Sequence, residues 1–236
     1  MDGRYQIRRS DRARRLRITV RPAGVEVVAP MSARDAEIAA FVRDHQGWIE
    51  AKLEAIRRKL AAHGGSSQLI DGARIPVRGA WQPLQVVRSF RLRPAVHEDG
   101  GVRVELPARL PVAEEEREVE RVLTGWLRRQ ARLDARALIA RHGARHGLRP
   151  RGLMIKAHRT LWGSCTGADV INLNWRLILA PTPVLEYVVV HELCHLRHRH
   201  HRPPFWRLVA EILPDYGEQR RWLRANGHLL TLKSGA

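Results

Sequence analysis

Hydrophobic and polar residues alternate near the start of the chain, over residues 14–21. A period of two predicts a strand with one buried face, and the apolar positions there are Leu16, Ile18 and Val20. A Pro-Ala-Gly turn follows, and residues 25–30 are again mostly apolar. The two segments are therefore predicted to pair as a β-hairpin.

The pattern changes to a helical period over residues 32–60. Apolar residues recur there at intervals of three and four, as in a helix with one buried face. Ser32 and Asp35 resemble a capping box at its start, and His63-Gly64-Gly65 predicts its end. Further strands are predicted at 73–78, 84–92 and 101–106.

The chain beyond residue 112 is predicted to be mostly helical. Residues 113–147 form a long amphipathic pattern that is acidic at its start and basic towards its end, as the helix dipole favours. Residues 171–181 are predicted as a strand, and Thr182-Pro183 predicts the start of another helix. Shorter helices are predicted around 203–213 and 217–225.

These elements predict an α+β fold in two domains. The first, residues 1–112, is β-rich with one long helix, and the second, residues 113–236, is mostly helical. The composition suits a folded chain, since 44% of the residues are hydrophobic.

The charge is unusual, because 42 Lys+Arg against 24 Asp+Glu give a net charge of +18. Such a field attracts polyanions, so non-specific association with nucleic acid is one expectation, and charges scattered over solvated faces are the alternative. Two cysteines, Cys165 and Cys194, cannot build a disulfide framework. The charged N-terminus does not resemble a signal peptide, and no apolar run reaches the roughly 18 residues of a membrane span. We therefore expect a reduced, cytoplasmic protein with no membrane partner.

Residues 191–195 read His-Glu-Leu-Cys-His inside the helix predicted from residue 182. His191 and His195 are one turn apart on one face, so that both imidazoles reach a single metal ion. Glu192, beside the first ligand, is placed to activate water as a general base. The preceding run of valines indicates that this face points inwards, where unpaired imidazoles are costly. The pattern predicts a catalytic zinc site in preference to a pair of surface histidines.

A catalytic zinc needs a third protein ligand and an open position. The candidates are His198, His200, His201 and Cys165. Spacing favours His201, ten residues after His191, because there the chain can leave the helix and turn back under the metal. Two prolines follow and prevent the helix from continuing regularly. Cys165 as the ligand would instead make a deformylase-like hydrolase.

The segment HELCHLRHRHHRPPFW resembles the signature of the YgjP-like metallopeptidases, relatives of the SprT and WLM zinc peptidases. Residues 161–181 and 213–223 resemble other parts of the same family, so the likeness covers nearly the whole chain. Leu161 and His200 stand where the family usually has arginine and asparagine, and neither difference removes a ligand.

This resemblance implies a minimal zincin-like catalytic domain that hydrolyses protein or peptide substrates. It implies one Zn²⁺ on His191, His195 and His201, with Glu192 as the general base. Candidates for stabilising the oxyanion are Tyr216, His158 and His228. The strand at 170–178 is either an edge on which an extended substrate pairs or a structural strand over the active helix. The other functions considered are the deformylase-like hydrolase and a nucleic-acid-associated zinc protein.

Overall fold

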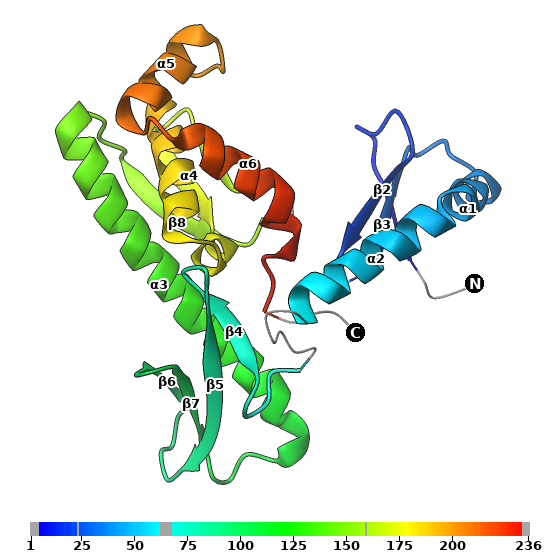
Figure 1. The fold of residues 1–236 in the computed structure, drawn as a ribbon, viewed down its shortest axis with the longest axis vertical. Helices are drawn as coiled ribbons and strands as arrows, with labels where there is room; N and C mark the ends of the chain where they lie inside the picture. Colours follow the sequence, from blue (N-terminus) through cyan, green and yellow to red (C-terminus); the bar gives the residue numbers. More distant parts are fainter. Residues whose placement is uncertain (1–4, 23, 62–67, 159, 233–236) are drawn as a thin grey trace. The chain divides into compact units, whose positions relative to one another are not determined.

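The computed structural model describes residues 5–22, 24–61, 68–158 and 160–232 (Figure 1). Contacts group the chain into two compact units, Met1–Gln68 with Thr231–Ala236, and Leu69–Leu230. The domain boundary predicted after residue 112 differs from this division, since it falls inside the second unit. The helix end predicted at residues 63–65 lies outside the described residues.

The first unit contains a three-stranded sheet in the order β1-β3-β2. The predicted hairpin is present as β2 (Arg17–Arg21) and β3 (Gly24–Ala29), which pair antiparallel. A third strand that was not predicted, β1 (Gln6–Arg9), pairs parallel with β3. Val27, Ala29 and Ile38 form the buried core between this sheet and the following helix.

The helix predicted over 32–60 is interrupted, and consists of α1 (Asp35–Asp44) and α2 (Gln46–Ala61). The His45 ring explains the break, because its Nδ1 donates to the Phe41 carbonyl at 2.8 Å. That carbonyl would otherwise accept the backbone N–H of His45, which donates instead to Val42. The predicted capping box is also displaced, since the helix begins at Asp35 and Glu37 accepts from the Arg34 backbone at 3.1 Å.

The second unit begins with a four-stranded sheet in the order β4-β5-β7-β6, and its strands are β4 (Arg74–Val77), β5 (Ala80–Ser89), β6 (Ala95–Glu98) and β7 (Val102–Pro107). The short η1 (Val112–Glu114) leads into α3 (Glu115–His146), whose 32 residues span about 48 Å. This helix packs on β6 and β7 and also on α4 and β8, two elements of the following part of the unit. That shared packing explains why residues 69–112 group with residues 113–230.

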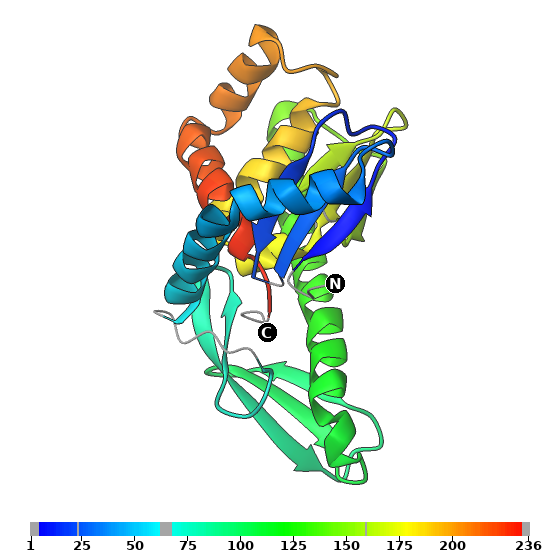
Figure 2. The ribbon, with the colours of Figure 1, turned by 90° about the vertical axis from the view of Figure 1, so that its right-hand side faces the viewer.

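The second sheet of this unit lies at the other end of α3 in both views (Figures 1 and 2). Its strands are β8 (Gly152–Lys156), β9 (Gly163–Cys165) and β10 (Val170–Asn174), in the order β8-β10-β9. The predicted strand at 171–181 is therefore β10 followed by a 3-10 helix, η2 (Trp175–Leu179). Because β10 is paired on both sides, the second alternative for 170–178, a structural strand, fits it, and β8 and β9 lie at the edges of this sheet.

Three helices complete the unit, namely α4 (Thr182–Cys194), α5 (Pro203–Ile212) and α6 (Tyr216–Asn226), with the short η3 (Gly227–Leu229) at the end. The central helix is α4, which contacts α3, α5, α6 and β9. No helix in the described residues is both long and apolar enough to cross a bilayer. The predicted α+β class is confirmed.

Candidate metal centre

The last turn of α4 carries His191 and His195. The helix ends at Cys194, and His195 is its C-cap with helical angles (φ −67°, ψ −16°), so the two rings remain one turn apart. Nδ1 of His195 donates to the His198 carbonyl at 2.9 Å. Because a carbonyl can only accept, Nδ1 carries the proton and Nε2 keeps a lone pair for a metal ion.

The loop between α4 and α5 brings His201 to these rings. Nε2 of His201 lies 3.1 Å from Nε2 of His195 and 3.0 Å from Nε2 of His191. Two nitrogen ligands of a tetrahedral zinc ion are about 3.3 Å apart. Among the described residues, these three histidines are the side chains whose ligand atoms lie close enough together, within 4.8 Å of one another, to hold one metal ion. Their geometry therefore fits one ion.

The other three candidates for a third ligand lie outside this group. His198 uses its carbonyl to orient His195, and the rings of His198 and His200 face each other at 6.3 Å. The Cys165 sulfur accepts from the Arg199 guanidinium at 3.3 Å. The same guanidinium donates to the Thr166 carbonyl at 2.7 Å and pairs with Asp169, so it joins the His201 loop to the β9–β10 turn.

Phe205 forms the floor of the centre. Its ring is fully buried, and its centroid lies 4.9, 4.6 and 4.8 Å from those of His191, His195 and His201 respectively. The next residue, Trp206, donates its indole N–H to the His201 carbonyl at 3.2 Å and stacks on the His201 ring. Both residues belong to the first turn of α5, so the two prolines begin a helix there, in addition to preventing the continuation of α4.

Glu192 is 4% exposed, and its Oε2 has no hydrogen-bond partner among the described residues. The same is true of the buried Nδ1 of His191. Burial raises the pKa of Glu192 to about 8, and burial with the neighbouring imidazoles lowers the pKa of His191 to about 3. An unpaired buried polar group costs about 1–3 kcal/mol. A divalent ion on the three imidazoles would favour their neutral form and the charged carboxylate, so this donor set suits a metal.

The backbone of β9 touches the side chain of Glu192. A Cβ atom built on Gly163 would lie 2.5 Å from Oε1 of Glu192, a distance that no real contact allows. Sequence analysis did not identify Gly163 as a site residue. A glycine within a strand is a signal for such close approach, but this strand is only three residues long and was not predicted.

Aromatic rings extend from the metal centre towards α6. Tyr187, one turn before His191, stacks on Tyr216 at 6.3 Å, and Tyr216 stacks on Trp206 at 5.6 Å. Of the three candidates for oxyanion stabilisation, Tyr216 is therefore joined to the centre by ring contacts. The guanidinium carbon of Arg220 lies 4.6 Å from the centroid of Trp206.

A comparison with protein families decides the identity of this arrangement. The model of the YgjP-like metallopeptidase domain matches residues 14–226. The chain belongs to the YgjP-like family. The predicted resemblance and the prediction of a metallopeptidase are confirmed for this YgjP-like protein.

No protein of curated function matches the YgjP-like chain. The crystal structure of the metallopeptidase zymogen of Pyrococcus abyssi abylysin is similar to 39% of this chain and 93% of its own, with 19% identity and a TM-score of 0.36.

Proposed function

We propose that this YgjP-like protein is a zinc-dependent peptidase, with zinc on His191, His195 and His201 and with Glu192 as the general base. The observation that carries the proposal is the convergence of three Nε2 atoms beside a buried carboxylate. Zinc bound there would polarise the substrate carbonyl and lower the pKa of water towards ~7.

The protein groups around the centre have separate tasks in this reaction. Glu192 takes a proton from the attacking water and passes it to the leaving amine. The His198 carbonyl holds the His195 ring in its ligating orientation. Phe205 covers the inner side of the three imidazoles and keeps water from that side.

The edge strand β9 offers a place for the substrate backbone. It lies against α4, and its first residue, Gly163, touches Glu192. An extended peptide that pairs with β9 would therefore carry its backbone past the general base. This role is the one considered as an alternative for the strand at 170–178.

The proposal is tested by metal content and peptide hydrolysis. We expect near-stoichiometric zinc by mass spectrometry in protein purified without chelators or added metal. Zinc should be lost in His201→Ala and kept in Cys165→Ala. Glu192→Gln should keep zinc and lose at least 100-fold in hydrolysis of a casein-derived peptide mixture.

Two outcomes would contradict this function. Loss of zinc with Cys165→Ala but not with His201→Ala would support the deformylase-like hydrolase. Full hydrolysis by Glu192→Gln would exclude this residue as the base.

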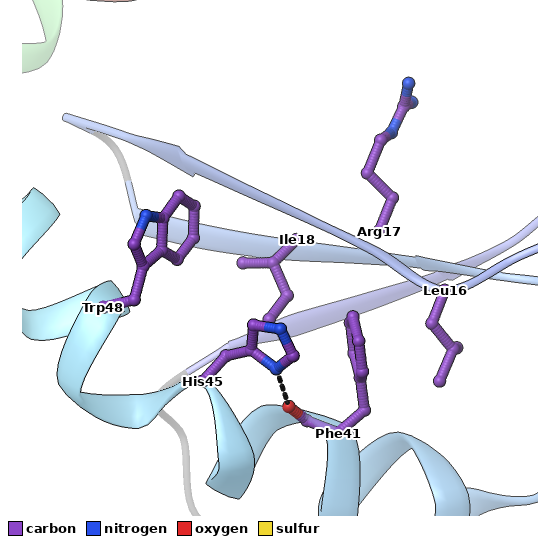
Figure 3. A pocket seen from close by; sticks show the side chains of 6 residues that line it. All are labelled: Leu16, Arg17, Ile18, Phe41, His45 and Trp48. Atoms are coloured by element: carbon purple, nitrogen blue, oxygen red, sulfur yellow. Dashed lines mark hydrogen bonds between the residues drawn. The ribbon is translucent and has the colours of Figure 1, made fainter.

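Association with nucleic acid is a second candidate function, supported by the surface of the first unit. Four arginines there are exposed and have no ion-pair partner within the described residues, namely Arg12, Arg14, Arg15 and Arg17. Beside them lies a groove of about 320 Å³ lined by Leu16, Arg17, Ile18, Phe41, His45 and Trp48 (Figure 3).

The groove combines features with which proteins bind single-stranded nucleic acid. Trp48 is 51% exposed, and the rings of Phe41 and His45, which also line the groove, lie 4.4 Å apart. The Arg17 side chain points away from these rings (Figure 3), where it could meet a phosphate while a base stacks inside. The cytoplasmic location of the protein also stays a prediction.

The nucleic-acid candidate is tested with a fluorescent single-stranded oligonucleotide. Binding should weaken steeply with salt, persist in Glu192→Gln, and fall at least fivefold in Trp48→Leu. Binding that is equal in Trp48→Leu and wild type would assign it to the general positive charge.

A further inference from the structure

Arg220 stands one helical turn after Tyr216 on α6, so the two side chains share a face of that helix. Its guanidinium lies over the indole of Trp206, 4.6 Å from the ring centroid. Trp206 in turn stacks on His201 at 5.7 Å and contacts His191 at 5.8 Å. One aromatic ring therefore links this cation to two of the three imidazoles of the metal centre.

Arg220 is half-buried, and no carboxylate pairs with it in the part of the chain that the structure describes. Two other arginines of this unit do have acidic partners, since Arg199 pairs with Asp169 and Arg141 with Glu186. Removing a cation from water without a counterion is unfavourable. The contact with Trp206 offsets part of this cost but leaves the charge uncompensated.

Arg220 lies beside the metal centre, because the Trp206 ring under its guanidinium stacks on the ring of His201. A positive charge beside the three imidazoles disfavours the binding of a metal cation, so the metal does not explain the position of Arg220. A negatively charged group of the substrate would explain it.

We propose that Arg220 binds a carboxylate of the substrate, and that the enzyme acts on peptides with a carboxylate close to the cleaved bond. This inference rests on the proposed peptidase function. A guanidinium stacked on an indole keeps its N–H groups free at the edge of its plane, where a carboxylate accepts two of them side by side. The carboxylate comes either from an acidic side chain or from the free C-terminus of a peptide.

The test compares Arg220→Gln with wild type on matched peptides. One pair differs by Glu against Gln beside the cleaved bond, and another by a free against an amidated C-terminus. Wild type should favour the carboxylate member of at least one pair by tenfold or more in kcat/KM. Arg220→Gln should lose this preference and cleave the neutral peptides within twofold of wild type, and Arg220→Lys should retain part of it.

The exposed neighbour Arg221 provides the matched control, because Arg221→Gln removes the same charge from the next position of α6. It should leave the preference unchanged. A preference that survives in Arg220→Gln, or an equal loss on all peptides, would overturn the inference. The pair of peptides that shows the preference identifies the source of the carboxylate.

A binding measurement separates this inference from the peptidase function. N-acetylglutamate and N-acetylglutamine are titrated by calorimetry into chelator-treated wild type and Arg220→Gln. Selective binding of N-acetylglutamate to wild type would support the carboxylate site even if no peptide is cleaved, and the peptidase function alone would then fail. Equal binding of N-acetylglutamate to both proteins, or no binding to wild type, would overturn the inference that Arg220 binds a carboxylate.

Discussion

Gly163 leaves no room for a side chain between β9 and Glu192. A Cβ atom there would lie 2.5 Å from Oε1, 2.8 Å from Cγ and 2.9 Å from Cδ of Glu192. Because the glutamate is buried and its helix is packed on six other elements, the carboxylate has little space to move away. The main chain of the edge strand thus forms one wall around the Glu192 carboxylate.

Gly163→Ala should displace Glu192 and lower kcat/KM for peptides by about 100-fold, while the three imidazoles still bind zinc. Overpacking of this kind also costs typically 1–3 kcal/mol in the free energy of unfolding. Peptide hydrolysis, zinc content and thermal unfolding check these expectations. Gly167→Ala is the control, because nothing lies within 4 Å of a Cβ atom there.

A double-mutant cycle shows whether Gly163 acts through Glu192. In a Glu192→Ala background the clashing side chain is absent, so Gly163→Ala should no longer destabilise the protein. An equal loss of stability in both backgrounds would mean that the alanine disturbs β9 itself.

Replacing Phe205 should weaken zinc binding. Phe205→Leu keeps most of the buried volume and should change stability by less than about 1.5 kcal/mol. It removes the ring that stacks on His195 and meets His191 and His201 edge-on, so we expect zinc affinity, measured by competition with a chromophoric chelator, to fall about tenfold. Phe41→Leu, in the first unit, should leave zinc affinity unchanged. Wild-type affinity in Phe205→Leu would show that the ring does not position the ligands.

Arg199→Gln should also reduce zinc affinity, but through the loop that carries His201. The substitution removes the bonds from this loop to Thr166 and Asp169. We expect a threefold to tenfold loss in the same competition assay, and faster hydrogen exchange in the His201 loop. Arg197→Gln, two residues earlier and bonded to the His146 carbonyl, is the matched control. Unchanged exchange in Arg199→Gln would contradict this role.

The two cysteines should differ in reactivity. Burial raises the pKa of Cys194 to about 12, and burial also raises the pKa of the half-buried Cys165, against the opposing charge of Arg199. Native protein should therefore expose one slowly reacting thiol to a disulfide reagent at pH 8, and the second only after denaturation. The rate for Cys165 should rise with pH as its thiolate forms. Two rapidly reacting thiols at pH 8 would contradict the burial of Cys194.

The raised pKa of Cys194 also predicts how the free energy of unfolding changes at alkaline pH. Its pKa is higher in the folded than in the unfolded chain, so the unfolded state releases its proton first. The stability that this thiol provides is present below its ordinary pKa of 9.0 and is lost as the pH rises towards about 12. Thermal unfolding between pH 8 and 11 should show a steeper decline in wild type than in Cys194→Ala.

The sequence predicted best what depends on neighbours along the chain. His191 and Glu192 lie in one helix that His195 caps, so their spacing predicted that these side chains lie close together, and the prolines after His201 indicated a turn. Contacts between distant segments were beyond such patterns. The edge position of β9 depends on its pairing with β10, and the approach of Gly163 to Glu192 depends on how that strand packs on α4.

The domain boundary predicted after residue 112 differs from the division by contacts for a similar reason. A change in composition near residue 110 indicated a boundary, yet α3 packs on strands from both sides of it. The helix over 32–60 was predicted as continuous because the apolar period continues through it. The hydrogen bond from the His45 ring to the Phe41 carbonyl, which an apolar period does not reveal, explains why the helix is interrupted.

The long helix α3 limits how this protein can be shortened or recombined. Its buried residues run from Val119 to Gly143, and they complete the packing of the four-stranded sheet at one end and of the β8–β10 layer at the other. A fragment that starts at residue 113 would keep every metal-site residue but expose to water the part of this apolar stripe that packs on β6 and β7. A cut after residue 68 would spare the stripe, so a fragment shortened from its N-terminus should begin near residue 69.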